Sequence, residues 1–170
     1  WEVPAGRFQS LNPAFIIIFG GVFSAIWIWL ETKGKHLSSL FKMGLGSVIM
    51  GIGFIFMVGA ATEHLKIGHS SMLWLVFAYL FHTLGELCLS PVSLGFITKV
   101  SPQRVVATMM GLYWAVTGIA QKLAAEIGKL SIELGEYPIF IGLFIFPVVF
   151  GILLMLFAKK INKLTHGLER

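Results

Sequence analysis

Charged residues are scarce in this sequence. Asp, Glu, Lys and Arg make up only 12% of the 170 residues, whereas 56% are hydrophobic. A soluble domain of this length has too much surface for its volume to hide so much apolar area. The shortage of charge therefore excludes a soluble fold, and the chain is expected to be surrounded by membrane lipid.

Cysteine is almost missing, and the basic residues form no patch. The single cysteine, Cys88, lies inside an apolar run, so neither a disulfide framework nor a metal site is expected. The net charge of +5 comes from residues that cluster between the apolar runs, as in loops that face anionic cytoplasmic lipid. This distribution does not indicate nucleic acid as a partner.

What the sequence does contain is a set of long apolar runs. Backbone groups in lipid must be hydrogen-bonded internally, so runs of about 20 apolar residues cross a membrane as helices. The sequence therefore predicts an all-α integral membrane fold with five transmembrane helices, at approximately 8–30, 43–60, 72–97, 105–129 and 138–159. In the second run Gly44, Gly51 and Gly59 recur at near-heptad spacing, which predicts close helix packing.

The basic residues between these runs predict the orientation. They gather after the first, third and fifth runs, as Lys33, Lys35 and Lys42, then Lys99 and Arg104, then Lys159, Lys160, Lys163 and Arg170. By the positive-inside rule, the N-terminus of the segment is expected outside and the C-terminus in the cytoplasm. Five spans with an external N-terminus, and a first residue other than methionine, are typical of the tail of a longer polypeptide.

The third run carries the residues that are hardest to explain by packing alone. His82, Glu86 and Ser90 are four residues apart, so they share one face of a helix. Inserting a carboxylate near the bilayer midplane is unfavourable, by about 3 kcal/mol on insertion scales. Glu86 is expected to hold a cationic substrate group or carry a proton, although a buried ion pair with another helix stays open. His82 could share a proton with Glu86 or hydrogen-bond a neighbouring helix.

Two further observations limit the chemistry. Ser90 alone would most often satisfy its own helix backbone, and residues stacked along one helix lack oxyanion donors or a metal triad. No catalytic residue and no enzyme activity are therefore expected. In the fourth run Lys122 and Glu126 lie at i and i+4, which favours mutual neutralisation over a role in a gate or proton relay.

Short motifs link the chain to a known family. The segments are Gly85-Glu-Leu-Cys-Leu-Ser-Pro91, Thr98-Lys-Val-Ser-Pro102, Met109-Met-Gly111 and, upstream, Phe8-Gln-Ser-Leu-Asn-Pro13. In this order and spacing they resemble the proton-dependent oligopeptide transporter (POT/PTR) family. The resemblance implies spans eight to twelve of a major-facilitator fold, which form most of its C-terminal bundle. The N-terminal transmembrane half would then be missing from this chain.

The resemblance also implies roles for single residues. Glu86 matches a glutamate that contacts the peptide's amino terminus and takes part in proton-linked gating, and Ser90 lies near the same pocket. Asn12 matches an asparagine that lines the peptide site, in which case the helix begins near Arg7 to Ser10 with Pro13 inside it. From the residues alone, Asn12 would instead be an N-cap with Pro13 at the first helical position.

One position departs from the family pattern. The family has a tryptophan three residues after the paired methionines, where it packs against a substrate side chain. Here that position is Tyr113, and Trp114 follows it. Either residue is a candidate for this contact.

The function implied by the resemblance is inward symport of di- and tripeptides with protons by alternating access. The proton would be the coupling ion, with Glu86 and His82 as candidates to carry it, and no other cofactor is expected. The intact protein would be a multi-pass protein of the cell (inner) membrane, and this chain alone would not transport. The alternatives are another substrate, such as nitrate, or a short membrane partner or regulatory protein that transports nothing.

Overall fold

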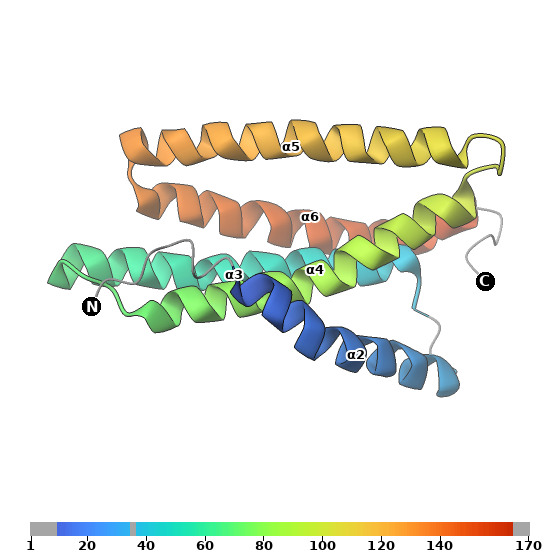
Figure 1. Cartoon of the computed structure of the whole chain (residues 1–170), viewed down its shortest axis with the longest axis horizontal. Helices are drawn as coiled ribbons and strands as arrows, with labels where there is room; N and C mark the ends of the chain where they lie inside the picture. The colour runs from blue at the N-terminus through green and yellow to red at the C-terminus, as the bar shows by residue number, and fades with distance from the viewer. Residues whose placement is uncertain (1–9, 35–36, 165–170) are drawn as a thin grey trace.

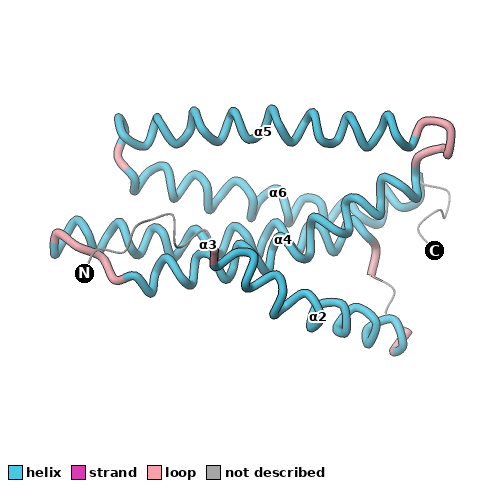
Figure 2. The backbone as a smooth tube through the Cα atoms, viewed as in Figure 1, coloured by secondary structure: helices cyan, strands magenta, loops and turns pink. Residues whose placement is uncertain are grey.

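A computed structural model describes residues 10–34 and 37–164, and these form five helices joined by short connections (Figures 1 and 2). In chain order they are α2 (Leu11–Thr32), α3 (Ser39–Ile67), α4 (Met72–Val100), α5 (Val106–Leu134) and α6 (Glu136–Leu164). No strand occurs within these ranges. The predicted all-α fold class and the number of helices are confirmed.

The helices extend beyond the apolar runs that predict them. α3 was expected at about 43–60 but covers Ser39–Ile67. At its start the Ser38 hydroxyl accepts a hydrogen bond from the Phe41 N–H at 3.2 Å. At its end Gly68 adopts a left-handed φ of 81° and donates to the His64 carbonyl. Capping residues outside the apolar run therefore decide where the helix begins and ends.

The start of α2 distinguishes the two expectations for Asn12. The helix begins at Leu11 with Ser10 as its N-cap, so Asn12 and Pro13 both lie in the first turn. The interpretation of Asn12 as an N-cap is therefore wrong. The expected start near Ser10 agrees with the structure, whereas Arg7 to Gln9 lie outside the described residues.

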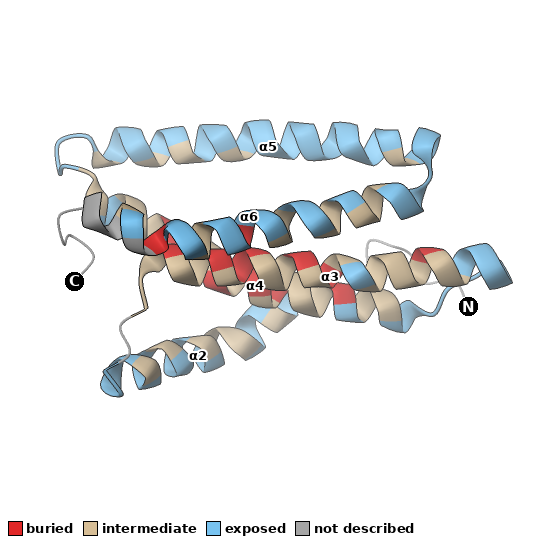
Figure 3. Ribbon diagram, turned by 180° about the vertical axis from the view of Figure 1, so that it is seen from behind, coloured by how far each residue is buried: buried red, intermediate tan, exposed pale blue. Residues whose placement is uncertain are grey.

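α3 is the central helix, and glycines allow its close contacts. A Cβ on Gly46 would lie 2.7 Å from the Gly85 carbonyl oxygen of α4, and a Cβ on Gly44 would lie 2.7 Å from the Gly151 carbonyl oxygen of α6. Gly51 also meets α6, whereas Gly59 meets the Trp74 ring of α4. The predicted glycine packing is confirmed, and the buried residues lie where α3, α4 and α6 meet (Figure 3).

α5 lies beside α6 but is exposed along nearly its whole length (Figures 1 and 3). Four helices of the described ranges, α2, α3, α4 and α6, are long and apolar enough to cross a membrane, and α5 is not among them. Its 29 residues are sufficient in length, but Lys122, Glu126, Lys129 and Glu133 occupy its second half. The prediction of five apolar spans therefore overstated the apolar character of this one helix.

The polar half of α5 also corrects a predicted ion pair. Glu126 pairs with Lys129 at 2.9 Å, and not with Lys122 as expected. A glutamate that precedes its lysine along a helix has the more favourable geometry, because this order complements the helix dipole. The pair Lys122–Glu126 has the opposite order.

Candidate functional site

Glu86 is the middle residue of α4, and the N-terminal end of α2 lies against the helix at this level (Figure 1). The Asn12 side-chain amide of α2 donates to Glu86 Oε2 at 3.2 Å. Since α4 has 29 residues and rises about 1.5 Å per residue, its middle lies well inside a hydrocarbon layer of about 30 Å. The geometry thus places a half-buried carboxylate between two apolar helices.

Thr83 completes this cluster. Its hydroxyl lies 2.7 Å from the Asn12 Oδ1 and 2.7 Å from the Tyr79 carbonyl oxygen, and the residue is fully buried. The Thr83 hydroxyl needs an acceptor and the Glu86 carboxylate a donor, so the orientation of the Asn12 amide follows from its neighbours. We call Asn12, Thr83 and Glu86 the Glu86 cluster. Asn12 and Glu86 were predicted from the sequence but Thr83 was not, although its position three residues before Glu86 puts it on a neighbouring part of the same face.

The Glu86 carboxylate has unused acceptor capacity. It offers about four lone-pair sites, and in residues 10–34 and 37–164 only Asn12 donates to it. The two ion pairs in this part of the chain are Lys42–Glu31 and Lys129–Glu126, so neither involves Glu86. A buried ion pair with a second helix, the alternative weighed from the sequence, is not observed among the described residues. The carboxylate therefore has lone pairs left for further hydrogen-bond donors.

His82 faces a different neighbour. Its ring lies 4.5 Å from the Phe54 ring of α3, centroid to centroid, and occupies the space that a side chain on Gly53 would fill. Its buried Nε2 has no hydrogen-bond partner among the described residues. The structure therefore places His82 in the α3–α4 interface, without a hydrogen bond to Glu86.

Ser90 and Ser93 follow Glu86 on α4 by one and two turns, and Ser93 contacts α5. Ser93 Oγ donates to the Ser90 carbonyl oxygen at 2.9 Å and lies 3.2 Å from the Tyr113 hydroxyl. Trp114 is 61% exposed, and its ring makes an edge contact with Tyr113 at 5.5 Å. Of the two aromatic candidates, Tyr113 is therefore the one that forms a hydrogen bond with α4, through Ser93. Ser93 was missed by the sequence analysis.

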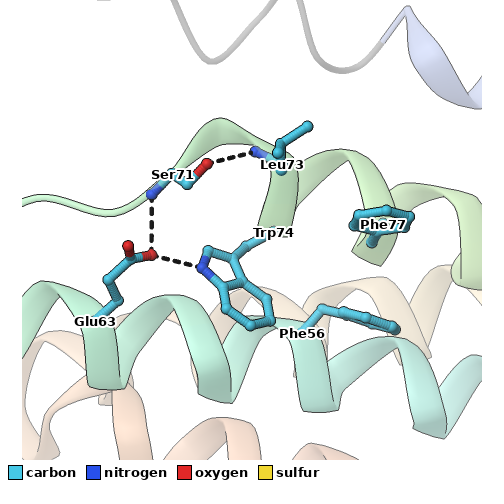
Figure 4. Close-up of a pocket in the computed structure, with 6 residues that line it drawn as sticks. All are labelled: Phe56, Glu63, Ser71, Leu73, Trp74 and Phe77. Carbon is cyan, nitrogen blue, oxygen red and sulfur yellow. Dashed lines mark hydrogen bonds between the residues drawn. The ribbon is translucent and has the colours of Figure 1, made fainter.

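A second polar cluster closes the turn between α3 and α4 (Figure 4). Glu63 Oε2 accepts from the Ser71 backbone N–H at 3.1 Å and from the Trp74 indole N–H at 2.5 Å. We call these three residues the Glu63 clasp. They line a cavity of about 380 Å³ together with Phe56, Leu73 and Phe77.

Comparison with known proteins decides the family. Residues 1–138 match the PTR2 model, whose description is "POT family". The chain belongs to the POT family. Relatives of this POT-family chain include an uncharacterized transporter, YclF, of Bacillus subtilis, 34% identical over 98% of the chain and 33% of the relative. A di-/tripeptide transporter of Lactococcus lactis is 31% identical over 96% of the chain and 33% of the relative. The peptide transporter YePEPT of Yersinia enterocolitica is 39% identical over 75% of the chain and 25% of the relative.

Solved structures show the same fold. The crystal structure of a peptide transporter POT in complex with sulfate matches 92% of the chain and 31% of its own length, with a TM-score of 0.82 and 34% identity. A POT family transporter in complex with a thioalcohol-conjugated peptide matches 91% of the chain and 31% of its own length, with a TM-score of 0.79 and 31% identity. The five helices thus form part of a major-facilitator fold in a multi-pass membrane protein. The chain spans a quarter to a third of the length of the curated relatives named here.

Proposed function

We propose that this chain is the C-terminal part of a proton-coupled symporter that moves di- and tripeptides inward by alternating access. The observation that carries the proposal is the Glu86 cluster, a carboxylate in the middle of an apolar helix that is held by an amide of α2 and can still accept further hydrogen bonds. The names of two relatives, a peptide transporter and a di-/tripeptide transporter, support peptide as the substrate class.

In this proposal Glu86 holds the peptide's amino terminus. An ammonium is a strong partner for a partly desolvated carboxylate, because charge-assisted hydrogen bonds are about twice as strong as neutral ones. Asn12 and Ser90 add polar contacts, and Tyr113, with Trp114 beside it, meets a substrate side chain. A proton bound to Glu86 removes the charge that holds the ammonium, so protonation and peptide binding are linked at one group. His82 is the second candidate for a proton.

The rest of the site is proposed to lie outside this chain. Transporters of this kind bind substrate near the membrane midplane between two helical bundles. Since the chain spans about a third of its peptide-transporting relative from Lactococcus lactis, we expect the remaining segment to supply cationic groups for the peptide carboxylate. The chain alone is then not transport-competent. The charge distribution supports an external N-terminus of the segment and a cytoplasmic C-terminus in the cell membrane.

The test is proton-driven uptake of a labelled dipeptide into proteoliposomes by the intact transporter, meaning the full polypeptide that contains this chain. Glu86→Gln should lower uptake by about tenfold or more, because a hydrogen bond to a charged group contributes roughly 1.5–3 kcal/mol. The matched control is Glu133→Gln, at an exposed position near the end of α5. Coupled uptake by Glu86→Gln equal to that of the control would refute the role of Glu86.

Two further outcomes bear on the alternatives. Uptake of labelled nitrate, with no uptake of dipeptide, would replace the substrate class and leave the fold assignment in place. Proton-driven dipeptide uptake by the 170-residue chain alone would contradict its proposed incompleteness. If the intact protein transports neither compound, a partner or regulatory role becomes the better hypothesis.

A further inference from the structure

α2 is held in place by little packing. None of its residues 11–32 is buried. Its N-terminal end lies against α4, whereas its C-terminal end diverges from the other helices (Figures 1 and 3). Asn12 nevertheless donates to Glu86 from the first turn of this helix. Packing alone therefore does little to fix the direction in which Asn12 points.

One face of α2 is half-buried, and it carries Asn12 near one end and Trp27 near the other. Between them Phe15, Phe19 and Phe23 follow at intervals of three or four residues, which is the spacing of one helix face. Ring contacts join Phe15 to Phe19 at 6.1 Å and Phe23 to Trp27 at 6.4 Å. Because a hydrogen-bonded helix is stiff, a contact that fixes Trp27 also limits the rotation of Asn12 about the helix axis.

Lys42, in the first turn of α3, provides such a contact. Its Nζ lies 5.0 Å from the centre of the Trp27 ring and 3.5 Å from Glu31 Oε1. Trp27 and Glu31 are four residues apart, so one lysine contacts two successive turns of α2. The Lys42 side chain is only 14% exposed. An exposed ion pair contributes little on its own, but a cation over a tryptophan ring contributes more when it is shielded from water. Lys42 therefore ties the diverging end of α2 to α3.

The burial of Lys42 is more than its charge alone would require. A lysine that only faces water or anionic lipid extends its ammonium outward along its flexible stem. Lys33, at the end of α2, makes a contact of the same kind but within its own helix end. Its Nζ lies 4.0 Å from the centre of the Trp29 ring, and Trp29 is 54% exposed. Lys42 instead turns toward a second helix.

We infer that Lys42 is a positioning residue for the Glu86 cluster. It holds Trp27 and Glu31, and this contact fixes the rotation of α2 about its axis. Asn12, roughly 22 Å away along the same helix at about 1.5 Å per residue, is thereby kept directed at Glu86. The inference rests on the proposed function and adds a residue that controls the site from a distance. Lys42 itself touches no substrate and acts through Asn12.

The experiment measures uptake of a labelled dipeptide against concentration by the intact transporter in proteoliposomes. Lys42→Met keeps an unbranched side chain but removes the charge. It should raise the half-saturating concentration by about twofold to fivefold, the value of one cation–π contact, and change the maximal rate less. Lys42→Arg should restore the wild-type value, because a guanidinium also stacks on aromatic rings and pairs with carboxylates. In an Asn12→Ala background, Lys42→Met should cause no further increase, because both changes act on the same contact.

Lys33→Met is the matched control, since it removes a lysine–tryptophan contact that does not join α2 to α3. It should keep the wild-type concentration dependence. The inference fails, and the proposed function stands, if Lys42→Met behaves as Lys33→Met does while wild type takes up dipeptide. It also fails if Lys42→Met lowers only Tm and the maximal rate, or if its effect multiplies that of Asn12→Ala in full. If wild type takes up no dipeptide, the proposed function fails, and the inference fails with it.

Discussion

Among the described residues, Glu63 and Glu86 both lie where α4 meets another helix, and they are bonded in different ways. Glu63 accepts two hydrogen bonds at one oxygen, from Ser71 and Trp74, both within eleven positions along the chain. Glu86 accepts one, at 3.2 Å, from Asn12, which is 74 positions away. The Glu63 carboxylate bonds only to residues at the α3–α4 turn, whereas the Glu86 carboxylate has lone pairs left for a ligand.

The difference in sequence separation has a physical consequence. A short turn costs little entropy to close, so the Glu63 clasp forms whenever α3 and α4 pack as a hairpin. The Asn12–Glu86 contact exists only while the N-terminal end of α2 lies against α4, and no residue of α2 is buried in the described structure. A contact with so little supporting packing depends on the position of α2, and the proposed alternating-access mechanism would move helices relative to one another.

The largest effect is expected at the close approach of α4 to α3, which sets the position of the helix that carries both Glu86 and Trp74. A Cβ on Gly85 would lie 2.7 Å from the Gly46 carbonyl oxygen and 2.8 Å from the Met50 backbone nitrogen. Backbone atoms cannot turn aside as a flexible side chain would. Gly85→Ala should therefore separate the helices and cost about 1–3 kcal/mol, as overpacking does. A lower Tm of the intact transporter in detergent, with loss of uptake, is the expected result.

Gly95→Ala is the matched control, because nothing lies within 4 Å of a Cβ at Gly95 of the same helix. Its Tm should equal or exceed that of wild type, since alanine favours helix over glycine by about 1 kcal/mol. Equal Tm values for the two variants would mean that the α3–α4 contact is looser than the structure has it.

An intermediate effect is expected from the groups that hold Glu86 in place. Asn12→Ala removes the donor to Glu86, and Thr83→Val removes the hydroxyl that orients the Asn12 amide. Each should raise the half-saturating peptide concentration, by about fivefold to tenfold for Asn12→Ala and less for Thr83→Val. The maximal rate should change less than the concentration dependence. Peptide uptake against concentration is the measurement.

Thr98→Val is the control for Thr83→Val, since the Thr98 hydroxyl is exposed and bonds only to Gly95 of its own helix. An Asn12→Ala variant with the concentration dependence of wild type would place Asn12 outside the peptide site.

The sequence predicts the fold better than it predicts the site. Apolar runs identify each helix and the glycines identify how α3 packs, because both are local patterns. The predicted ends of α3 were wrong because its capping residues, Ser38 and Gly68, lie beyond the apolar run. The order of Lys122 and Glu126 along the helix was also overlooked, and the pair that forms is Glu126–Lys129.

Within the site, whether a residue could be predicted from the sequence depended on the hydrogen bonds that it makes. A glutamate in an apolar helix can be identified as a candidate from the sequence without knowledge of its partner. Asn12 needed the family resemblance, because its partner is 74 positions away. Thr83 and Ser93 were missed because a hydroxyl in such a helix usually bonds its own backbone. Ser93 donates to the Ser90 carbonyl and also lies within hydrogen-bond distance of Tyr113 on α5. The single Thr83 hydrogen is shared between the Tyr79 carbonyl of its own helix and the Asn12 amide oxygen of α2.

The smallest effect on transport is expected at the Glu63 clasp, and it tests the comparison directly. Glu63→Gln keeps the shape of the side chain but removes the charge that strengthens the bonds from Ser71 and Trp74. Tm should fall slightly, because the α3–α4 turn is held less firmly, while dipeptide uptake stays near that of wild type. Glu86→Gln should instead lower dipeptide uptake and leave Tm near that of wild type, since one long hydrogen bond contributes little to the stability of the fold. If Glu63→Gln abolished uptake at unchanged Tm, the clasp would belong to the transport mechanism, and the distinction between a structural and a ligand-binding carboxylate would not hold.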